Sequence, residues 1–395
     1  MKQYLRFEYF YIIILIIWEP FQKFILNADG AGKSVMILTF VFLGFSLNKK
    51  SFYQLAIKKP ISIWGIWVIY AIIIALIKGY SYDLPESTFY MLLIIPYLLM
   101  IIINLMAIND YNRLINVLII AMYINVILVL LFNTGEGVDG RYGGDMNSNT
   151  IGIMSTILLM FLYLKYIHSN TSMLFLLVLA IIPTYTLIIS GSKTAFGGFL
   201  LLVLSHFIIN RTKNTLLNLL RISFLLLLFS IPLYFVINNT QLGERILSST
   251  EEGEELQVET GNAFLDKFGD RGIFYYIGWQ IFLDNPITGV GLGNYVHYNE
   301  EGQVQHTEYM IQLSELGIIG SMLFVAFYFS VIKGIRRIKQ DSINRKKKEL
   351  SLAYIIIILV MLTSTRMFFV WYMWSVIGVV TGYVTKEKFS LKHYI

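Results

Sequence analysis

The sequence predicts an all-α integral membrane protein. Hydrophobic residues make up 56% of its 395 residues, and charged residues only 14%. Runs of isoleucine, leucine, phenylalanine and valine recur along most of the chain, and many approach the roughly 20 apolar residues that a membrane-spanning helix needs. Basic residues gather in the loops on one side of these runs, which predicts a single orientation for the spans.

We place about twelve spanning helices on the chain by this length rule. The first run ends at Glu19-Pro20 without a small-residue cleavage site, so we expect a retained span rather than a signal peptide. The expected spans cover roughly residues 5–18, 34–47, 61–77, 88–108, 113–133, 149–167, 172–190, 194–210, 216–237, 309–332, 351–366 and 369–385.

The distribution of charge predicts that both termini are cytoplasmic. Most acidic residues fall in loops on the opposite, external side, and the positive-inside rule then orients every span. The net charge of +6 is therefore a consequence of topology, which argues against a nucleic-acid partner. The inner side collects Lys49, Lys50, Lys58, Lys59, Arg211, Lys213, Lys333, Arg336, Arg337, Lys339, the run 345–348 and the lysines of the tail.

The spans predict three regions along the chain. Residues 1–237 hold nine spans, residues 238–308 form one large external loop, and residues 309–395 hold three spans with a basic inner loop and tail. The first half of the external loop is acidic and poor in apolar residues, so we expect it to carry little chemistry. Its second half predicts an amphipathic helix over about 272–285, stopped by Pro286. The apolar stripe expected on it is Ile273, Tyr276, Ile277, Gln280, Ile281 and Leu283.

The stretch GVGLGN, which contains Gly289 and Gly291, follows this helix. It matches no dinucleotide or phosphate-loop fingerprint, because it does not lie between a strand and a helix. Tight turning and close backbone packing explain it better. The chain has no cysteine and no metal-binding motif, so we expect neither a metal nor another cofactor. Ser190 and Lys193 form an S-x-x-K pattern by chance, because the companion motifs of that class are missing.

Three basic side chains each lie where a predicted external helix begins: Lys193, Arg271 and His306. The macrodipole of a helix favours anions at its N-terminus and disfavours cations. An anion on the substrate would rationalise three such placements on one face, because helix N-termini and cations together bind phosphate. Simpler interpretations stay open: Lys193 snorkels to the headgroups, Arg271 pairs with an acid of its own loop, and His306 is a neutral interfacial residue.

Two further arginines are candidates for binding an anionic substrate. Arg366 lies near the outer end of the eleventh span. A charged side chain at membrane depth is costly, which makes Arg366 a functional candidate by default; the alternative is that its side chain snorkels to the interface. Arg141 lies in an external loop, on weaker grounds, since a solvated loop tolerates arginine. His297 is also external, in a loop that we expect to be flexible.

A family resemblance rests on residues 186–325. The stretch HTEYMIQLSELGIIG, with His306, Tyr309, Leu313, Glu315, Gly317 and Gly320 as its marked positions, follows Arg271, PITGVGLGN and, further upstream, SGSKT. Together these stretches resemble the O-antigen ligase and O-antigen polymerase superfamily. The resemblance implies a GT-C-type helical bundle in the bacterial inner membrane that works on its external face, on glycans carried by undecaprenyl pyrophosphate.

The resemblance also implies roles for particular residues. Arg271 matches the family's pyrophosphate-binding arginine, Lys193 stands where many members have arginine, and His306 matches the histidine beside the acceptor. Lysine cannot hold phosphate through a planar fork, so its role is less defined. Thr307 stands where many ligases have asparagine. A chain-length regulator is a candidate protein partner.

We expect an inverting, metal-independent polysaccharide polymerase with His306 as base and Arg271 and Lys193 on the pyrophosphate, because cations stabilise charge that builds on the leaving group. A helix start keeps an imidazole neutral and able to accept a proton. Glu315 is expected to orient structure, and Gly317 and Gly320 to permit close helix approach. A ligase that transfers glycan to lipid A core is the alternative, and a lipid-linked oligosaccharide flippase is the alternative from another class.

Overall fold

The computed structural model describes residues 54–81, 86–133, 146–169, 171–211, 270–299, 307–338, 342–366 and 370–392, together with scattered single positions. Every helix named below lies in these ranges, and no extended strand occurs in them. The first two expected spans and the ninth fall largely outside the described residues. The structure therefore bears on the remaining expected elements.

The first two long helices follow the expected spans. Helix α4 covers Ile61–Lys78 and stops at Gly79. The φ of Gly79 is 74°, a backbone conformation that residues with a β-carbon rarely adopt. Helix α5 covers Glu86–Phe132 and is interrupted at Asp110, where φ is −152° and ψ is 92°. The Asp110 carboxylate accepts a hydrogen bond from the Arg113 backbone N–H at 3.1 Å, as an N-cap does. This interruption separates the segments predicted as spans 88–108 and 113–133.

Side-chain caps start two of the next three helices, α6 and α8. Helix α6 covers Ser148–His168, and the Asn147 side chain accepts from the Asn149 N–H at its start. Helix α7 covers Met173–Ile189 and helix α8 covers Lys193–Ile209. Ser192 caps α8 by accepting from the Ala195 N–H, so Lys193 is its first residue, as predicted.

The C-terminal half differs most from the expectation. Helix α11 covers Asp270–Asp284, and the 3-10 helix η4 covers Asn294–Tyr298. The single span expected over 309–332 is broken into a short helix α12 (Glu308–Met310), a π-helical turn η5 (Ile311–Glu315) and helix α13 (Gly317–Arg336). Helices α14 (Ser342–Met361) and α15 (Trp371–Lys392) complete the described chain. The unbroken tenth span was therefore a wrong prediction.

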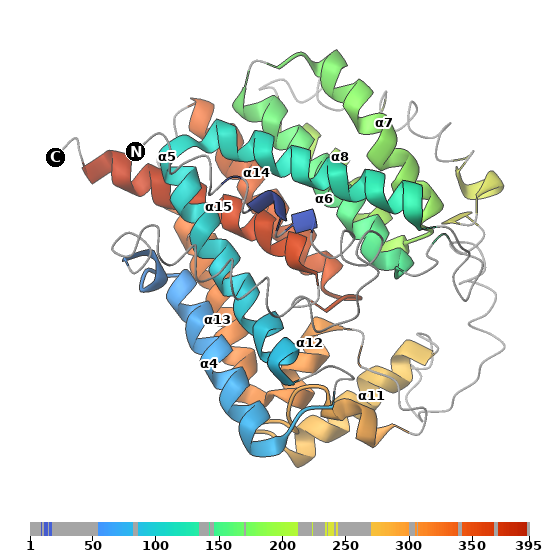
Figure 1. Ribbon diagram of the computed structural model, residues 1–395, viewed down its shortest axis with the longest axis vertical. Helices are drawn as coiled ribbons and strands as arrows, with labels where there is room; N and C mark the ends of the chain where they lie inside the picture. Colours follow the sequence, from blue (N-terminus) through green and yellow to red (C-terminus); the bar gives the residue numbers. More distant parts are fainter. Residues whose placement is uncertain are drawn as a thin grey trace.

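Two helix pairs organise the core around the site (Figure 1). Helix α15 lies along α5, and Gly378 and Gly382 allow the approach, because β-carbons there would lie 3.0 Å from Ile103 and 2.5 Å from Ala107. Helix α4 lies beside α13, and the rings of Trp64 and Trp67 stack at 4.3 Å in the buried interior. Helices α6, α7 and α8 form a neighbouring group (Figure 1).

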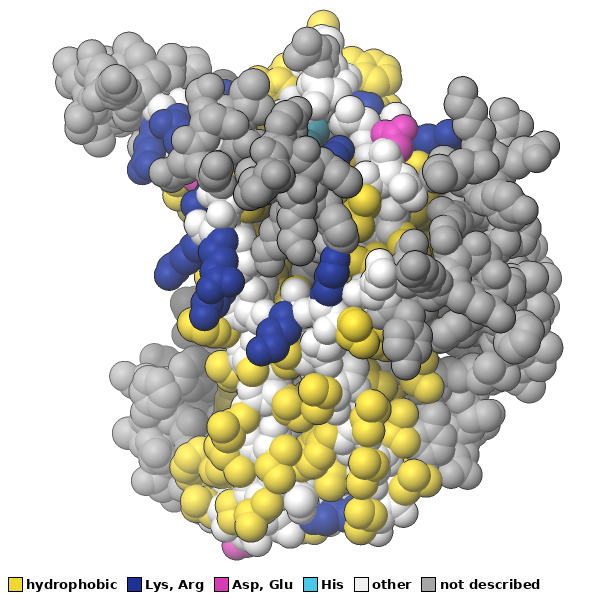
Figure 2. Space-filling view, turned by 90° about the vertical axis from the view of Figure 1, so that its left-hand side faces the viewer, with side chains coloured by type: hydrophobic (Ala, Val, Ile, Leu, Met, Phe, Trp, Pro, Cys, Tyr) yellow, Lys and Arg dark blue, Asp and Glu magenta, His cyan; other side chains and the backbone are white. Residues whose placement is uncertain are grey.

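Four described helices are long and apolar enough to cross a membrane: Ile61–Lys78, Leu93–Phe132, Ser148–His168 and Gly317–Arg336. Shorter apolar helices cover Met173–Ile189 and Lys193–Ile209. An all-helical membrane protein is thus supported, while the count of about twelve spans and the GT-C-type bundle stay predictions. Figure 2 shows a broad hydrophobic surface with lysine and arginine side chains gathered beyond one end of it.

Candidate functional site

The loop after α11 is tied to the turn before α13 by its backbone. The Val290 N–H donates to the Ser314 carbonyl and the Gly291 N–H to the Glu315 carbonyl, both at 2.9 Å. The Gly293 N–H donates to the Glu315 carboxylate at 2.8 Å. Three amides of the glycine-rich loop are therefore used inside the protein, which agrees with the prediction that this loop is not a phosphate cradle.

The same loop satisfies the first amides of α13. The Ile318 N–H donates to the Pro286 carbonyl at 2.8 Å, and the Ile319 N–H donates to the Ile287 carbonyl at 3.4 Å. These are donors that a helix start leaves without an intrahelical partner. The α13 start is thus capped by main chain and turned away from any external anion.

Glycines make this contact possible. Gly317 has a φ of 65°, and a β-carbon there would lie 2.5 Å from the Ile287 carbonyl carbon. A β-carbon on Gly289 would lie 2.3 Å from the Glu315 carbonyl carbon. The close backbone packing expected of the glycine-rich loop is therefore seen at Gly289, whereas Gly317 meets this loop and not the neighbouring helix that we expected. Gly320 differs, because its hypothetical β-carbon meets Leu316 of its own turn rather than a neighbouring helix.

A buried polar chain joins α4 to the turn η5. The Trp67 indole N–H donates to the Gln312 side-chain oxygen at 2.8 Å, and the Gln312 amide donates to the Glu308 carboxylate at 2.7 Å. Glu308 is fully buried and its N–H donates to the Leu362 carbonyl at 3.0 Å. Satisfied networks of this kind fix one arrangement of the helices that contribute to them.

Glu315 lies two residues before the candidate spanning helix α13, and it is 2% exposed. Burial raises the pKa of its carboxyl to about 7, an effect that Arg366 and the Gly293 N–H oppose and Glu308 assists. Its contacts with the loop fit the supporting role that the sequence predicted for it.

The segment around position 306 is held from two sides. His306 itself lies outside the described residues, but Gln305 and Thr307 flank it and are buried. The Arg366 guanidinium donates through Nε to the Gln305 carbonyl at 2.6 Å. The Gln305 amide donates to the Phe274 carbonyl of α11 at 3.0 Å. Gln305, the residue before His306, is therefore held between α11 and the segment that follows α14.

Other predicted residues converge on the same segments. Arg271 lies in the first turn of α11, about 4.5 Å along the helix axis from Phe274; its side chain is outside the described part. Thr194, next to Lys193, shares a hydrogen bond with Ser364, two residues before Arg366. The chain segments that carry Lys193, Arg271, His306 and Arg366 are thus linked. The structure leaves Arg141 outside its described residues.

Two sequence interpretations change with the structure. Phe274 and Ile281 of α11 are buried, whereas Tyr276 and Leu283 are 39% and 52% exposed. The stripe expected on α11 therefore mixes two faces, because a 15-residue helix with aromatic residues all around gives no clear periodicity. Tyr309, expected to support the site, donates to the Leu359 carbonyl at 2.6 Å and so joins α12 to α14.

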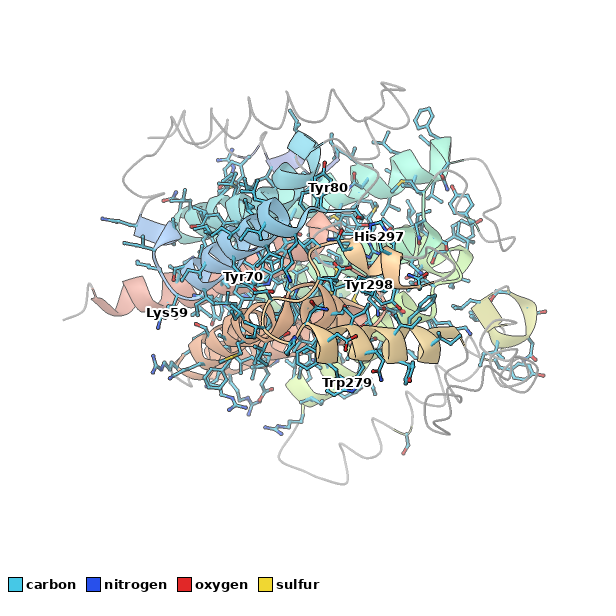
Figure 3. The ribbon with its side chains drawn as sticks, turned by 90° about the horizontal axis from the view of Figure 1, so that it is seen from below. Lys59, Tyr70, Tyr80, Trp279, His297 and Tyr298 are labelled. Carbon is cyan, nitrogen blue, oxygen red and sulfur yellow. The ribbon has the colours of Figure 1, made fainter. Side chains whose placement is uncertain are left out.

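An open cavity of about 690 Å³ lies beside the glycine-rich loop. Ser81 donates to the Asn294 side chain at 2.7 Å and lies 2.5 Å from Nε2 of His297. His297 therefore belongs to the ordered helix η4, contrary to the flexible loop we expected. Figure 3 shows His297 and Tyr298 on this side of the protein with Tyr80. The lining residues are Lys78, Gly79, Tyr80, Ser81, Asn285, Val290, Asn294, His297 and Tyr298.

Helix η4 and Gln305 share a partner in α11. The Tyr295 hydroxyl of η4 donates to the Phe274 carbonyl at 3.1 Å, and this carbonyl also accepts from Gln305. Sequence reasoning missed Gln305, Gln312 and Ser81, because single polar residues near span ends carry no spacing signal. In the described part of the chain, no three histidine or acidic residues lie together as metal ligands would.

Comparison with known families finds a match in the part of the chain that contains these segments. Residues 175–325 match the family model described as O-antigen ligase. The match covers α7, α8, α11, the glycine-rich loop and the turn into α13. No curated protein matches the chain.

Proposed function

We propose that this chain, which belongs to the O-antigen polymerase and ligase superfamily, is a polysaccharide polymerase that joins lipid-linked repeat units of an O-antigen or capsule. The superfamily membership supports a membrane enzyme of the ligase and polymerase type. In the proposal the donor is a growing glycan on undecaprenyl pyrophosphate, and the acceptor is a hydroxyl of a second lipid-linked repeat unit.

The observation that carries this proposal is the convergence of four basic segments. Arg366 binds the residue before His306, that residue binds α11 one turn after Arg271, and Thr194 next to Lys193 binds Ser364. These links connect chain segments, far apart in the sequence, that carry Lys193, Arg271 and Arg366 and the residue next to His306. A pyrophosphate needs such a group of fixed cations, because leaving-group charge is stabilised best by preorganised donors.

In the proposed reaction the acceptor hydroxyl oxygen attacks the anomeric carbon of the donor glycan from the face opposite the pyrophosphate. The bond between this carbon and the pyrophosphate oxygen breaks, and the electron pair leaves with undecaprenyl pyrophosphate. His306 takes the hydroxyl proton as general base. Arg271 and Lys193 stabilise the leaving charge, with Arg366 and Arg141 as further phosphate ligands. The configuration of the anomeric carbon is thereby inverted, and the proposed step uses no metal or cofactor.

Thr307 supports a polar ligand beside His306. Its hydroxyl is buried and has no hydrogen-bond partner among the described residues, although the side chain is only 4% exposed. Leaving a buried hydroxyl unpaired costs about 1–3 kcal/mol. A substrate hydroxyl or its phosphate oxygen would satisfy this group when bound.

The open cavity next to the glycine-rich loop is suited to the glycan of the acceptor. Its amides, hydroxyls and imidazole can exchange hydrogen bonds with sugar hydroxyls, and Tyr80 and Tyr298 provide ring faces. Gly289 and Gly291 shape the wall between the cavity and Glu315. We place this face outside the bacterial inner membrane, with both termini in the cytoplasm and residues 238–308 as the external loop.

Two alternatives make different products. A ligase uses the same chemistry but requires a lipid A core acceptor, and the family match fits it equally. A flippase moves lipid-linked oligosaccharide without forming a bond. A chain-length regulator protein would modify the polymerase product and leave the other two activities unaffected.

The test uses purified full-length protein with lipid-linked repeat units from the same bacterium and no added metal. On a gel, the wild type should give a ladder of products. His306→Ala and Arg271→Ala should abolish this ladder. Arg366→Gln should lower the rate of polymer formation by about 100-fold, as the loss of a transition-state donor does. Arg336→Gln, at the far end of α13, is the matched control and should keep the ladder. Product only when lipid A core is added would establish the ligase instead.

A further inference from the structure

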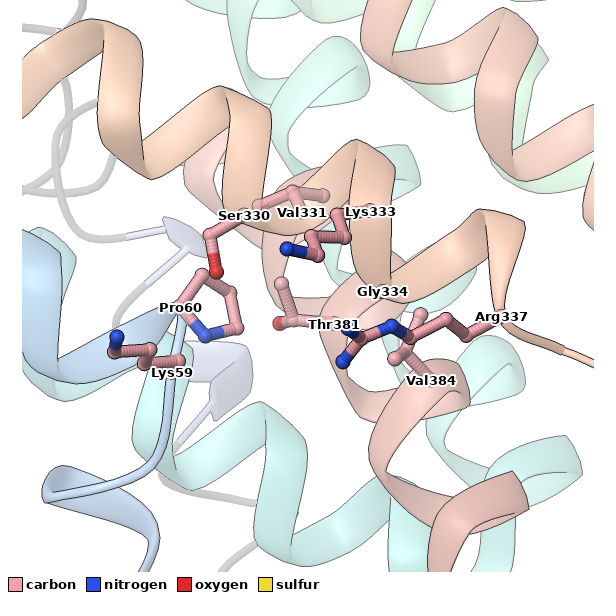
Figure 4. A pocket seen from close by; sticks show the side chains of 9 residues that line it. All are labelled: Lys59, Pro60, Ser330, Val331, Lys333, Gly334, Arg337, Thr381 and Val384. Atoms are coloured by element: carbon pink, nitrogen blue, oxygen red, sulfur yellow. The ribbon is translucent and has the colours of Figure 1, made fainter.

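A second cavity, of about 210 Å³, lies where the start of α4 and the end of α13 meet the middle of α15 (Figure 4). Three cations line it: Lys59, Lys333 and Arg337. Figure 4 shows the charged groups of Lys333 and Arg337 turned toward the centre, with Lys59 at the opposite edge. None of the described lining residues is acidic. The cavity is therefore a site for an anion.

Lys59 precedes α4, whereas Lys333 and Arg337 lie at the end of α13, and none of the three forms a salt bridge with a described acidic residue. The salt bridges of the described residues join Arg211 and Arg345 to Glu349, and the cavity takes part in neither. Thr381, at the back of the cavity, accepts from the Asn104 amide at 2.7 Å, which fixes α15 against α5. Three cations around one space repel one another unless an anion lies between them.

An exposed apolar surface continues from the cavity along α4 and α13. Side chains more than half exposed occur along both helices, and Phe329 lies 5.9 Å from the Lys333 ammonium group. They include Ile66, Ile69, Leu76, Ile77, Met322, Val325 and Phe329. Figure 2 shows this hydrophobic surface with the cationic side chains beyond its end. A ligand that satisfies both regions has an anionic head and hydrocarbon chains.

The dimensions agree with a membrane lipid. The 18 residues of α4 extend for about 27 Å, close to the roughly 30 Å thickness of the hydrocarbon layer. The cavity at the first residue of α4 thus lies at headgroup depth, at the end opposite Lys78 and the glycine-rich loop. A basic space between spanning helices at this depth suits the phosphate of an anionic lipid.

We propose that this cavity binds the phosphate headgroup of an anionic phospholipid whose acyl chains lie on the exposed face of α4 and α13. Arg337 holds two phosphate oxygens through its planar fork, and Lys59 and Lys333 add charge from either side. This lipid is a structural ligand that differs from the glycan substrates, and the inference does not depend on the proposed activity.

The test titrates purified full-length protein with dioleoylphosphatidylglycerol or dioleoylphosphatidylcholine and counts bound lipids by native mass spectrometry. We expect the wild type to prefer the anionic lipid. Lys333→Gln with Arg337→Gln should weaken its binding roughly thirtyfold, and Lys59→Gln alone about fivefold, because each cation near the surface contributes to anionic lipid binding. Arg336→Gln with Lys346→Gln is the matched control: it removes two cations of the same region that do not line the cavity.

Several outcomes overturn the proposal. Equal binding of both lipids by the wild type would contradict the proposed site. If the two double variants weaken phosphatidylglycerol binding equally, the lipid is attracted by the basic surface in general and not by this cavity. Sodium phosphate that raises the thermal unfolding temperature as much as phosphatidylglycerol does would identify a free-anion site instead of a lipid site. If the Lys333 and Arg337 double variant does not fold, Lys59→Gln decides the matter, since loss of preference there supports the site and unchanged preference contradicts it.

Discussion

Helices α4 and α13 run side by side, and their two ends use cations in opposite ways. At one end Lys78 donates to the Gly289 carbonyl, and the α13 start is capped by the carbonyls of Pro286 and Ile287. At the other end Lys59, Lys333 and Arg337 surround a cavity without a described acidic residue. At the first end, carbonyls of the protein accept the hydrogen bonds of Lys78 and of the α13 start, and the second end is suited to an external anion.

This difference shows that a basic residue at a helix end does not by itself mark a substrate site. What decides its role is whether carbonyl and carboxylate groups of neighbouring segments already accept its hydrogen bonds. Lys78 joins two segments of the protein, whereas Lys59, Lys333 and Arg337 share a cavity that opens to the surface. Variants at the two ends should therefore differ in stability, and the following predictions run from the largest effect to the smallest.

Gly317→Ala should lower the free energy of unfolding most, by about 4 kcal/mol, because it adds the penalty of a left-handed backbone conformation to a steric clash. The new β-carbon would lie 2.5 Å from the Ile287 carbonyl carbon. Thermal unfolding in detergent measures this loss. Gly197→Ala is the control, since a β-carbon there meets nothing within 4 Å. A small loss at Gly317 would show that the loop can move away from α13.

Glu315 should make stability depend on pH. Its carboxyl has a pKa raised from 4.5 to about 7 in the folded protein, so the folded state holds its proton more firmly than the unfolded state. The resulting stability is complete below about pH 4.5 and is lost as the pH rises through 7, by about 3 kcal/mol. Unfolding temperatures between pH 5 and 8 measure the slope. Glu315→Gln should flatten it, and an unchanged slope would assign the effect to another group.

Gln312→Leu should cost about 2 kcal/mol, because it leaves the buried Trp67 indole N–H and the Glu308 carboxylate without their shared partner. The double variant Gln312→Leu with Trp67→Phe removes one of these two unpaired groups. Measured by unfolding temperatures against Trp67→Phe alone, the further loss caused by Gln312→Leu should be smaller than its loss in the wild type. Equal losses in both would mean that the Trp67 hydrogen bond contributes little.

Lys333→Gln should change the stability of lipid-free protein least, by less than about 0.5 kcal/mol, since it is a surface substitution that removes no hydrogen bond within the described chain. Chemical or thermal unfolding in neutral detergent measures this. The same variant should lose most of its stabilisation by phosphatidylglycerol. A large loss of stability in neutral detergent would mean that groups of the protein itself bind Lys333.

Much of the helical framework was predictable from local pattern. The expected bounds of α4, α6, α7 and α8 agree with the structure within about two residues, the usual precision at helix ends. The interruption near Asp110 and the start of α8 were also expected, because the apolar runs break there, and the structure shows a capping residue at each.

The parts that could not be predicted depend on partners distant in sequence. The break of the tenth span follows from the Pro286 and Ile287 carbonyls, which meet the α13 start only in the folded chain. The inner face of α11 is set by Gln305 and Tyr295, and an aromatic-rich helix gives no periodic signal for it.

The sequence by itself determined the membrane class, most helix bounds and the basic residues around which a phosphate-handling site is proposed, because apolar run length, capping residues and charge are local properties. Only the tertiary structure decided that Arg366 binds Gln305, that Glu315 holds the glycine-rich loop and that Lys59, Lys333 and Arg337 share a cavity. These contacts join residues from different helices, and their geometry is set by how the helices pack rather than by any one segment.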